Sequence, residues 1–181
     1  MSTNLSNKRR AYSSSTGRMA EVRFVRSARS KGLLVTKSTH TEDRHEHIDY
    51  WLAVSPTGKR WGVDVKGNNL PDEIWVEFRN VHGQFGWMMG DAKWIAFEMC
   101  ELGGFVRVER EELLDWCLCN VDFTTSVIYK CDAYRKIYQR RNRKDKISML
   151  VLSDLQELKS YEVIKYKASY VHPLTNNTIT I

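Results

Sequence analysis

Apolar residues recur along this chain at two spacings, one typical of helices and one typical of strands. Between residues 18 and 31 the spacing is helical, which predicts a helix that ends at Gly32. Farther along, short segments rich in apolar and β-branched residues predict strands. The predicted strands cover residues 33–37, 48–54, 60–66, 74–78, 93–98, 105–108 and 149–152. Further helices are predicted over residues 110–118 and from Ser153 onward, where Gln156 completes a capping box.

The order of these elements predicts the fold class. A helix, several strands, a helix, a strand and a final helix indicate a mixed α/β (α+β) domain with a central mixed sheet flanked by helices. A chain of 181 residues is long enough to bury one core and need not form two domains. We therefore predict a flexible basic tail over residues 1–17 and a single domain over residues 18–181.

Charge and hydropathy narrow the classes of protein that the chain can represent. The formal net charge is +6, which permits binding to polyanions such as nucleic acids without requiring it. The sequence contains no apolar run long enough to span a bilayer, and its first residues lack the apolar stretch of a secretory signal peptide. We expect a cytoplasmic protein with no membrane partner, although the basic, Ser-rich start leaves a mitochondrial transit peptide open.

Cysteine and histidine give only a weak indication of a metal centre. The four cysteines lack the spacing of a zinc ribbon, so we expect reduced, buried thiols. His40, His45 and His47 are interpreted as a solvated turn that enters a strand, with a zinc site as the alternative.

The strongest candidate for chemistry lies on two neighbouring predicted strands. Asp49 lies on the first, Asp64 and Lys66 lie on the second, and a Ser-Pro-Thr-Gly turn between them predicts an antiparallel hairpin. Because side chains alternate along a strand, Asp64 and Lys66 should share a face, about 6.6 Å apart. Strand pairing would bring the Asp49 carboxylate towards Asp64, with roughly 5 Å between their Cβ atoms.

Two facing carboxylates repel each other unless a cation lies between them. Mg²⁺ suits such a site, because it takes one or two protein carboxylates and completes its shell with water and phosphate oxygens. The ion would lower the pKa of a bound water and stabilise charge on phosphorus, while Lys66 would orient or deprotonate the nucleophile. This equipment indicates hydrolysis of a phosphodiester, with an ordinary solvated charged strand as the alternative.

Two further carboxylates are candidates for supporting roles. Glu21 shares a helical face with Phe24 and Ala28, so it should point inward. It would then assist the metal site, or form a salt bridge with a nearby arginine. Glu77 lies on a predicted strand expected near the Asp64 strand, and it would be a further metal ligand or a surface partner of Arg79.

These residues give the chain a resemblance to the PD-(D/E)XK nuclease superfamily, in which a helix Glu, a strand Asp and a strand (Asp/Glu)-X-Lys surround Mg²⁺. The resemblance spans residues 18–98, and the matching positions are Glu21, Asp49, Asp64 and Lys66. Ile48 stands where the motif's name has Pro. The resemblance implies a restriction-endonuclease-like fold, Mg²⁺ with Mn²⁺ as a substitute, and catalytic roles for the four matching residues.

A second similarity is narrower. Segments 75–81, 86–87 and 92–98 are similar to a pattern found in small uncharacterised nuclease-like proteins of bacteriophages. That similarity implies a phage-encoded protein, which would act in the host cytoplasm.

A basic stretch over residues 134–146 is the candidate for contact with DNA. It holds seven Lys or Arg residues, and the candidates for backbone contact are Arg140, Arg141, Arg143 and Lys144. A solvated helix face is the alternative interpretation. The loop 80–87 would close over the site, with Gln84 bonding to water or phosphate and Trp87 stacking on a base, or would form only a tight turn.

Together these features predict a Mg²⁺-dependent DNA endonuclease. A structure-selective, Holliday-junction-type resolvase is a close alternative, and it would require a homodimer. A third possibility is a non-catalytic nucleic-acid-binding or host-interaction protein that keeps the nuclease fold.

Overall fold

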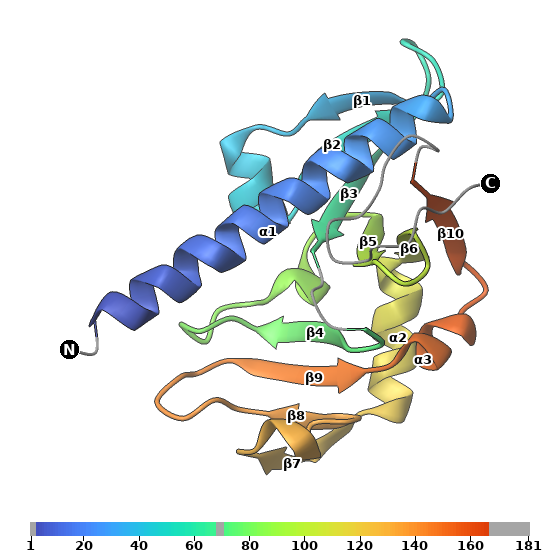
Figure 1. The fold of residues 1–181 in the computed structure, drawn as a ribbon. Coiled ribbons are helices and arrows are strands. Elements are labelled where there is room, and N and C mark those ends of the chain that lie inside the picture. The colour runs from blue at the N-terminus through green and yellow to red at the C-terminus, as the bar shows by residue number, and fades with distance from the viewer. Residues whose placement is uncertain (1–2, 68–70, 167–181) are drawn as a thin grey trace.

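The computed structural model describes residues 3–67 and 71–166, with side chains from Ser15 onward (Figure 1). Within these residues, one sheet has six strands: β1 (Leu34–Lys37), β2 (Tyr50–Ala53), β3 (Arg60–Lys66), β5 (Trp94–Met99), β6 (Gly104–Glu109) and β10 (Glu162–Lys165). The second described sheet has four: β4 (Ile74–Arg79), β7 (Asp122–Val127), β8 (Lys136–Tyr138) and β9 (Lys146–Leu150). The α-helices are α1 (Thr3–Ser30), α2 (Arg110–Asn120) and α3 (Leu152–Gln156). Short helical turns are η1 (Glu42–Glu46), η2 (Trp87–Met89) and η3 (Lys130–Asp132). The predicted mixed α+β class is confirmed.

The six-stranded sheet runs in the order β1-β2-β3-β5-β6-β10. Only β3 and β5 among these neighbours are parallel, so the described sheet is mixed. The predicted hairpin between β2 and β3 is confirmed, with Tyr50 opposite Val63 and Ala53 opposite Arg60. Between β3 and β5 the chain leaves the six-stranded sheet. It forms β4, which belongs to the second sheet, and then the helical turn η2.

Helix α1 crosses one face of the six-stranded sheet and begins earlier than predicted (Figure 1). It starts at Thr3 rather than near residue 18, so the segment predicted as a flexible tail is helical from Thr3 onward. Gly17 does not end the helix, because one glycine weakens a helix interior by only about 1 kcal/mol. Residues 1 and 2 lie outside the described part of the chain.

One face of α1 packs on the sheet. Ala20, Phe24 and Ala28 are buried at helical spacing, and the ring of Phe24 meets Phe105 edge-on at 5.3 Å between centroids. Arg23 is buried on the same face, because it forms a bidentate ion pair with Glu98 of β5.

The basic stretch is not a helix. It forms β8, a turn and the start of β9, so the interpretation as a solvated helix face is wrong. Strand β9 pairs with β4, with Ile74 opposite Leu150. Burial alternates along β9, with Ile147 partly buried and Ser148 buried, as expected for a strand. The sequence analysis did not predict β7, β8 or β10.

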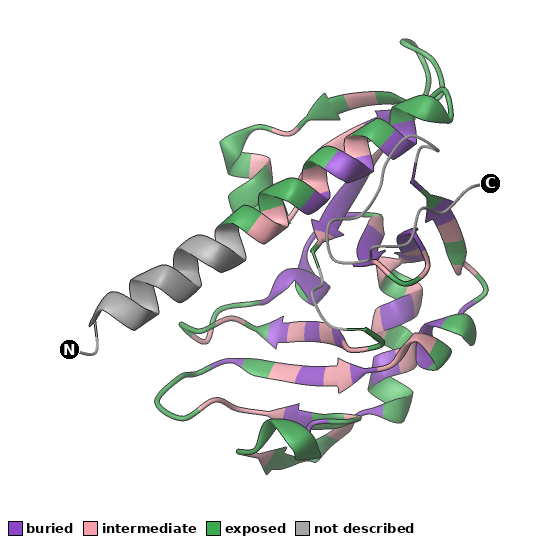
Figure 2. Ribbon diagram, in the orientation of Figure 1, coloured by how far each residue is buried: buried purple, intermediate pink, exposed green. Residues whose placement is uncertain are grey.

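Two apolar clusters pack on the six-stranded sheet. Figure 2 shows buried residues along β3 and β5 and at intervals along α1. Val63 and Val65 belong to the cluster beneath α1. Ile95 and Phe97 of the neighbouring β5 belong to the other cluster, which also contains residues of β4, η2 and α2. Because side chains alternate along a strand, Asp64 and Lys66 point away from α1, towards the second sheet.

Three smaller findings complete the description. No helix in the described residues is long and apolar enough to cross a membrane. The cysteines are free thiols, and Cys117 is buried as expected, but Cys119 and Cys131 are exposed. Residues 167–181, which were predicted to belong to the same domain, lie outside the described residues.

Candidate active site

The β2–β3 hairpin brings Asp49 near Asp64. Asp49 immediately precedes β2, and its backbone N–H donates at 2.9 Å to the carbonyl of Val63, the strand partner of Tyr50. On its other side, the backbone N–H and the hydroxyl of Ser38 both donate to the Asp49 carbonyl, at 3.1 and 3.0 Å. The backbone of Asp49 is therefore held between β3 and the residue that follows β1, and its carboxylate lies close enough to Asp64 for that charge to raise the pKa of Asp49.

Asp64 and Lys66 share one face of β3. The Lys66 ammonium lies 2.6 Å from Asp64 Oδ2, and only 5% of the Asp64 side chain is exposed. That buried oxygen nevertheless makes no hydrogen bond of acceptable geometry in the described structure. The ammonium also lies 4.9 Å from the centroid of the Trp87 ring, a cation–π contact. Asp64 is thus a buried carboxylate that is paired with the Lys66 ammonium.

Asp49 carries the electrostatic strain of the pair. Burial and the nearby charge of Asp64 raise the pKa of Asp49 from 3.8 to about 7. A hydrogen bond from the Val65 N–H to Asp49 Oδ2, 2.7 Å long, opposes this rise. Lys37 Nζ lies 3.8 Å from Oδ1, close to the limit for an ion pair. Near neutral pH, Asp49 can therefore take up a proton, or share a cation with Asp64.

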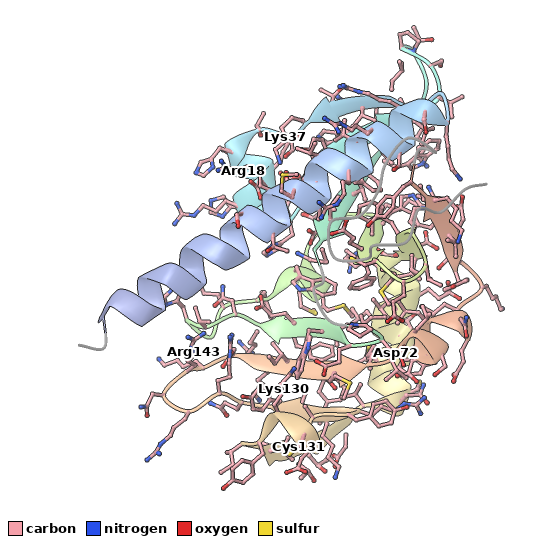
Figure 3. The ribbon with its side chains drawn as sticks, in the orientation of Figure 1. Arg18, Lys37, Asp72, Lys130, Cys131 and Arg143 are labelled. Atoms are coloured by element: carbon pink, nitrogen blue, oxygen red, sulfur yellow. The ribbon has the colours of Figure 1, made fainter. Side chains whose placement is uncertain are left out.

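Glu21, on α1, is connected to the site through hydrogen bonds with two other side chains. Its Oε2 accepts hydrogen bonds from Lys37 Nζ and from the Tyr50 hydroxyl, each 3.0 Å long. Figure 3 labels Lys37 beside α1. The charge of Glu21 also contributes to the raised pKa of Asp49. Glu21 is therefore brought to the site, and the salt bridge that it forms is with a lysine rather than with an arginine.

Glu77 approaches from the second sheet. It is partly buried on β4, and burial raises its pKa, while the charge of Lys66 lowers it and that of Asp64 adds to the rise. These electrostatic couplings show that Glu77 lies near the site although β4 does not pair with β3. Arg79, its alternative partner, instead donates to the Gly83 carbonyl at 2.8 Å.

The sequence analysis missed two side chains of the site. Lys37 ends β1 opposite Tyr50, and only the register of β1 could have placed it beside Asp49. His47 was interpreted as part of a solvated turn, but it is partly buried and has a left-handed backbone with φ of 55°. Burial lowers the pKa of His47 below its ordinary value, and the charge of Asp64 opposes this shift, so the imidazole lies close enough to sense that carboxylate. Its position two residues before Asp49 was the available signal.

The carboxylates fit a Mg²⁺ ion that keeps much of its water. No group of three or more His, Cys, Asp or Glu side chains within residues 3–67 and 71–166 forms a ready-made metal site, so Glu77 does not complete a three-ligand set. Mg²⁺ commonly takes one or two protein carboxylates and fills its remaining positions with water and phosphate oxygens. Asp49 and Asp64 offer that number, and Asp64 Oδ2 makes an ion pair with Lys66 but no hydrogen bond within the described part of the chain.

The four basic candidates lie at the turn between β8 and β9. Arg141, Arg143 and Lys144 are exposed, and Figure 3 labels Arg143 at this turn. Arg140 differs from them, because its Nε forms an ion pair with the fully buried Asp145. Three candidates are thus accessible to a large anion, and the fourth is held in place.

The two loop candidates, Gln84 and Trp87, lie in different surroundings. Gln84 is exposed in the turn after β4. The neighbouring Gly83 lies against the Lys144 side chain, so that a Cβ atom added at position 83 would be 3.2 Å from the Cβ of Lys144. This contact groups Gln84 with the basic turn. Trp87 is buried beneath Lys66 and packs against Phe97, with 5.9 Å between ring centroids, so little of its face is open to a base.

Comparisons of the chain with protein-family models, with curated proteins and with solved structures found no match.

Proposed function

We propose that this chain is a metal-dependent DNA endonuclease, with Mg²⁺ as its ion and Mn²⁺ as a substitute. The observation that carries the proposal is the neighbouring pair of carboxylates, Asp49 and Asp64, with the Lys66 ammonium 2.6 Å from a buried Asp64 oxygen that makes no hydrogen bond within the described residues. Helix α1, the antiparallel strands β1, β2 and β3, and strand β5, which is parallel to β3, support the resemblance to PD-(D/E)XK nucleases.

In this proposal the two aspartates and Lys66 have different roles. Asp49 and Asp64 would hold the ion. Bound Mg²⁺ would supply an activated water and would stabilise charge on the phosphoryl oxygens. Lys66 would orient the attacking water and would counter the negative charge that develops on the phosphate.

The other carboxylates would act at longer range. Glu21 would hold the Lys37 ammonium near Asp49, which limits the repulsion between the facing carboxylates. Glu77 would bind the hydrated ion through a water, since it adds to the negative charge of the site without completing a ligand set.

DNA is the proposed substrate because of the charge near the site. The chain carries a formal net charge of +6, and the turn between β8 and β9 exposes three cations. Contacts from such side chains to phosphates position a nucleic acid without reading its sequence. The proposed enzyme therefore cuts with little sequence preference.

Asp64→Asn is the sharpest test, because it keeps the side-chain volume and removes the charge. We expect the variant to fold and to lose the rise in melting temperature that Mg²⁺ gives the parent protein. Nicking of supercoiled plasmid should fall by about a hundredfold or more, as when a group that stabilises the transition state is removed. Asp115→Asn, at an exposed position on α2, is the matched control and should cut like the parent.

Two results would argue against the proposal. Undiminished cutting by a folded Asp64→Asn protein would remove the site from the chemistry. A parent protein that shifts plasmid mobility equally with Mg²⁺, Mn²⁺ or EDTA, and leaves it uncut, would instead be the non-catalytic nucleic-acid-binding protein.

A further inference from the structure

A cavity of about 410 Å³ lies over the second sheet, next to the carboxylate site. Its lining includes three aromatic and three charged side chains, which are Trp75, Glu77, Trp87, Lys130, Tyr138 and Arg140. A volume of this size falls within the usual range of small-molecule sites, roughly 300–1,000 Å³.

Two aromatic rings line the cavity, and a neighbouring carboxylate bonds to one of them. The rings of Trp75 and Tyr138 lie 5.8 Å apart between centroids, with 55° between their planes. The Trp75 indole N–H donates to Glu73 Oε2 at 3.2 Å, and the Lys130 ammonium lies 2.7 Å from that oxygen. Glu73 thereby links the indole of Trp75 to the ammonium of Lys130, and both side chains line the cavity.

The cations of the cavity are placed for a phosphate. Arg140 is held by its Nε on the buried Asp145, and a guanidinium has further N–H donors on its two Nη atoms. Lys130 lies 5.5 Å from the centroid of the Trp75 ring and is half exposed. A fixed guanidinium and an accessible ammonium are both common ligands of phosphate groups.

The cavity shares two side chains with the proposed active site. Trp87 lines the cavity, and the Lys66 ammonium lies 4.9 Å from its ring centroid. Glu77 also lines the cavity and is coupled electrostatically to Lys66 and Asp64. A strand bound near the carboxylates therefore lies within reach of the cavity.

We propose that this cavity receives one unstacked nucleotide of a nucleic acid strand, with its base against Trp75 and Tyr138 and its phosphate at Arg140 and Lys130. This inference rests on the proposed function and deepens it, because it names single-stranded or locally unpaired nucleic acid as the substrate. A base leaves its stack most readily where it is already unpaired. Stacking on aromatic side chains tolerates every base, since each base has a π-face.

Other occupants fit the lining less well. Inorganic phosphate would leave both rings in contact with water and would meet the Glu77 carboxylate. A purely apolar ligand would bury Glu77 and Arg140 without giving them hydrogen bonds, which is unfavourable. A nucleotide offers an aromatic face to the rings, N–H donors to Glu77 and a phosphate to the cations.

Binding in EDTA tests the inference, because cutting is then suppressed. Isothermal titration calorimetry of the full chain would use a single-stranded oligonucleotide of about ten nucleotides, a length within the site size of single-strand binders. Tyr138→Leu and Lys130→Gln should each weaken binding about tenfold, and Tyr138→Phe should restore the parent affinity. Lys159→Gln, an exposed charge-matched control, should bind like the parent.

Further arms separate the possible ligands. Competition by dAMP should be weaker than competition by the oligonucleotide, and inorganic phosphate and N-acetyltryptophanamide should compete poorly. Equal affinity for dAMP and the oligonucleotide would overturn the assignment to a strand, and unchanged binding by both Tyr138→Leu and Lys130→Gln would overturn the cavity as the site. Asp64→Asn should keep this binding, so a failure of the proposed cutting reaction is seen separately from a failure of the cavity.

Discussion

Asp49 and Asp64 repel each other across the β2–β3 hairpin, and the surrounding lysines relieve the two carboxylates unequally. Lys66 lies 2.6 Å from Asp64, whereas Lys37 lies 3.8 Å from Asp49 and is closer to Glu21. Burial and the Asp64 charge accordingly raise the pKa of Asp49 to about 7. The uptake of a proton or of a divalent ion by Asp49 therefore stabilises the fold.

This strain predicts a pH dependence of stability in EDTA. Between about pH 4 and pH 7 the folded protein binds a proton at Asp49 that the unfolded chain has already released. The free energy of unfolding should therefore fall as pH rises through this window, by an amount on the order of a few kcal/mol, and this contribution should level off above pH 7. Asp49→Asn has no such group, so urea titrations should show a smaller fall for the variant.

The comparison between proteins isolates Asp49 from the other titrating groups. Asp115→Asn, whose carboxylate is exposed, should follow the curve of the parent. Parallel curves for Asp49→Asn and the parent would show that the carboxylate is not strained by folding.

The sequence could predict this pair because the information was local. A four-residue turn and the alternation of β3 bring Asp49, Asp64 and Lys66 together without reference to the rest of the chain. Lys37 and Glu77 arrive through the register of β1 and through a second sheet, which depend on long-range packing. Trp75 and Tyr138 also meet only once β4, β9 and β8 are in place.

Helix α1 is attached to the sheet by a buried charge as well as by apolar side chains. Arg23 and Glu98 form a bidentate ion pair, and the Tyr166 hydroxyl donates to Glu98 Oε1 at 2.7 Å. Because Glu98 lies on β5 next to β3, this ion pair ties the helix that carries Glu21 to the sheet that carries Asp64. The position of Glu21 at the site depends on that attachment.

Glu98→Ala should therefore destabilise the protein strongly. Removing one partner of a buried ion pair leaves a guanidinium desolvated without its carboxylate, which typically costs about 3–5 kcal/mol. Chemical denaturation would measure the change. Glu162→Ala is the matched control, because the Arg107–Glu162 pair is half exposed on the Glu162 side and should contribute at most about 1 kcal/mol. Equal effects of the two substitutions would contradict the buried role of Glu98.

The limits of α1 and the strand β10 show why some elements escaped prediction. The first half of α1 lacks an apolar stripe, so nothing in its periodicity distinguishes a helix from a flexible tail. In β10 only Ile164 is buried, and the strand exists because it pairs with β6. Partners distant in the chain, rather than local propensity, define such short edge strands.

The turn between β8 and β9 exposes three cations, and its position bears on how a nucleic acid would lie. The turn between β8 and β9 and the N-terminal end of α1 extend to the same side of the structure (Figure 1). That turn exposes Arg141, Arg143 and Lys144, and none of them is part of the carboxylate site. They can therefore be changed without altering the proposed chemistry.

Neutralising this turn should change the salt dependence of DNA binding. For each phosphate that the protein no longer neutralises, the slope of log K against log salt becomes shallower by about 0.9 for duplex DNA and by about 0.7 for a single strand. Replacing Arg141, Arg143 and Lys144 by glutamine should thus reduce the slope by about two to three if all three contact phosphates.

The control replaces the exposed Lys31, Lys59 and Lys159 by glutamine, and both variants fall from a formal charge of +6 to +3. Fluorescence anisotropy in EDTA over a salt series would measure both. A slope that falls equally in the two variants would mean that net charge alone, and not the turn, binds the phosphates.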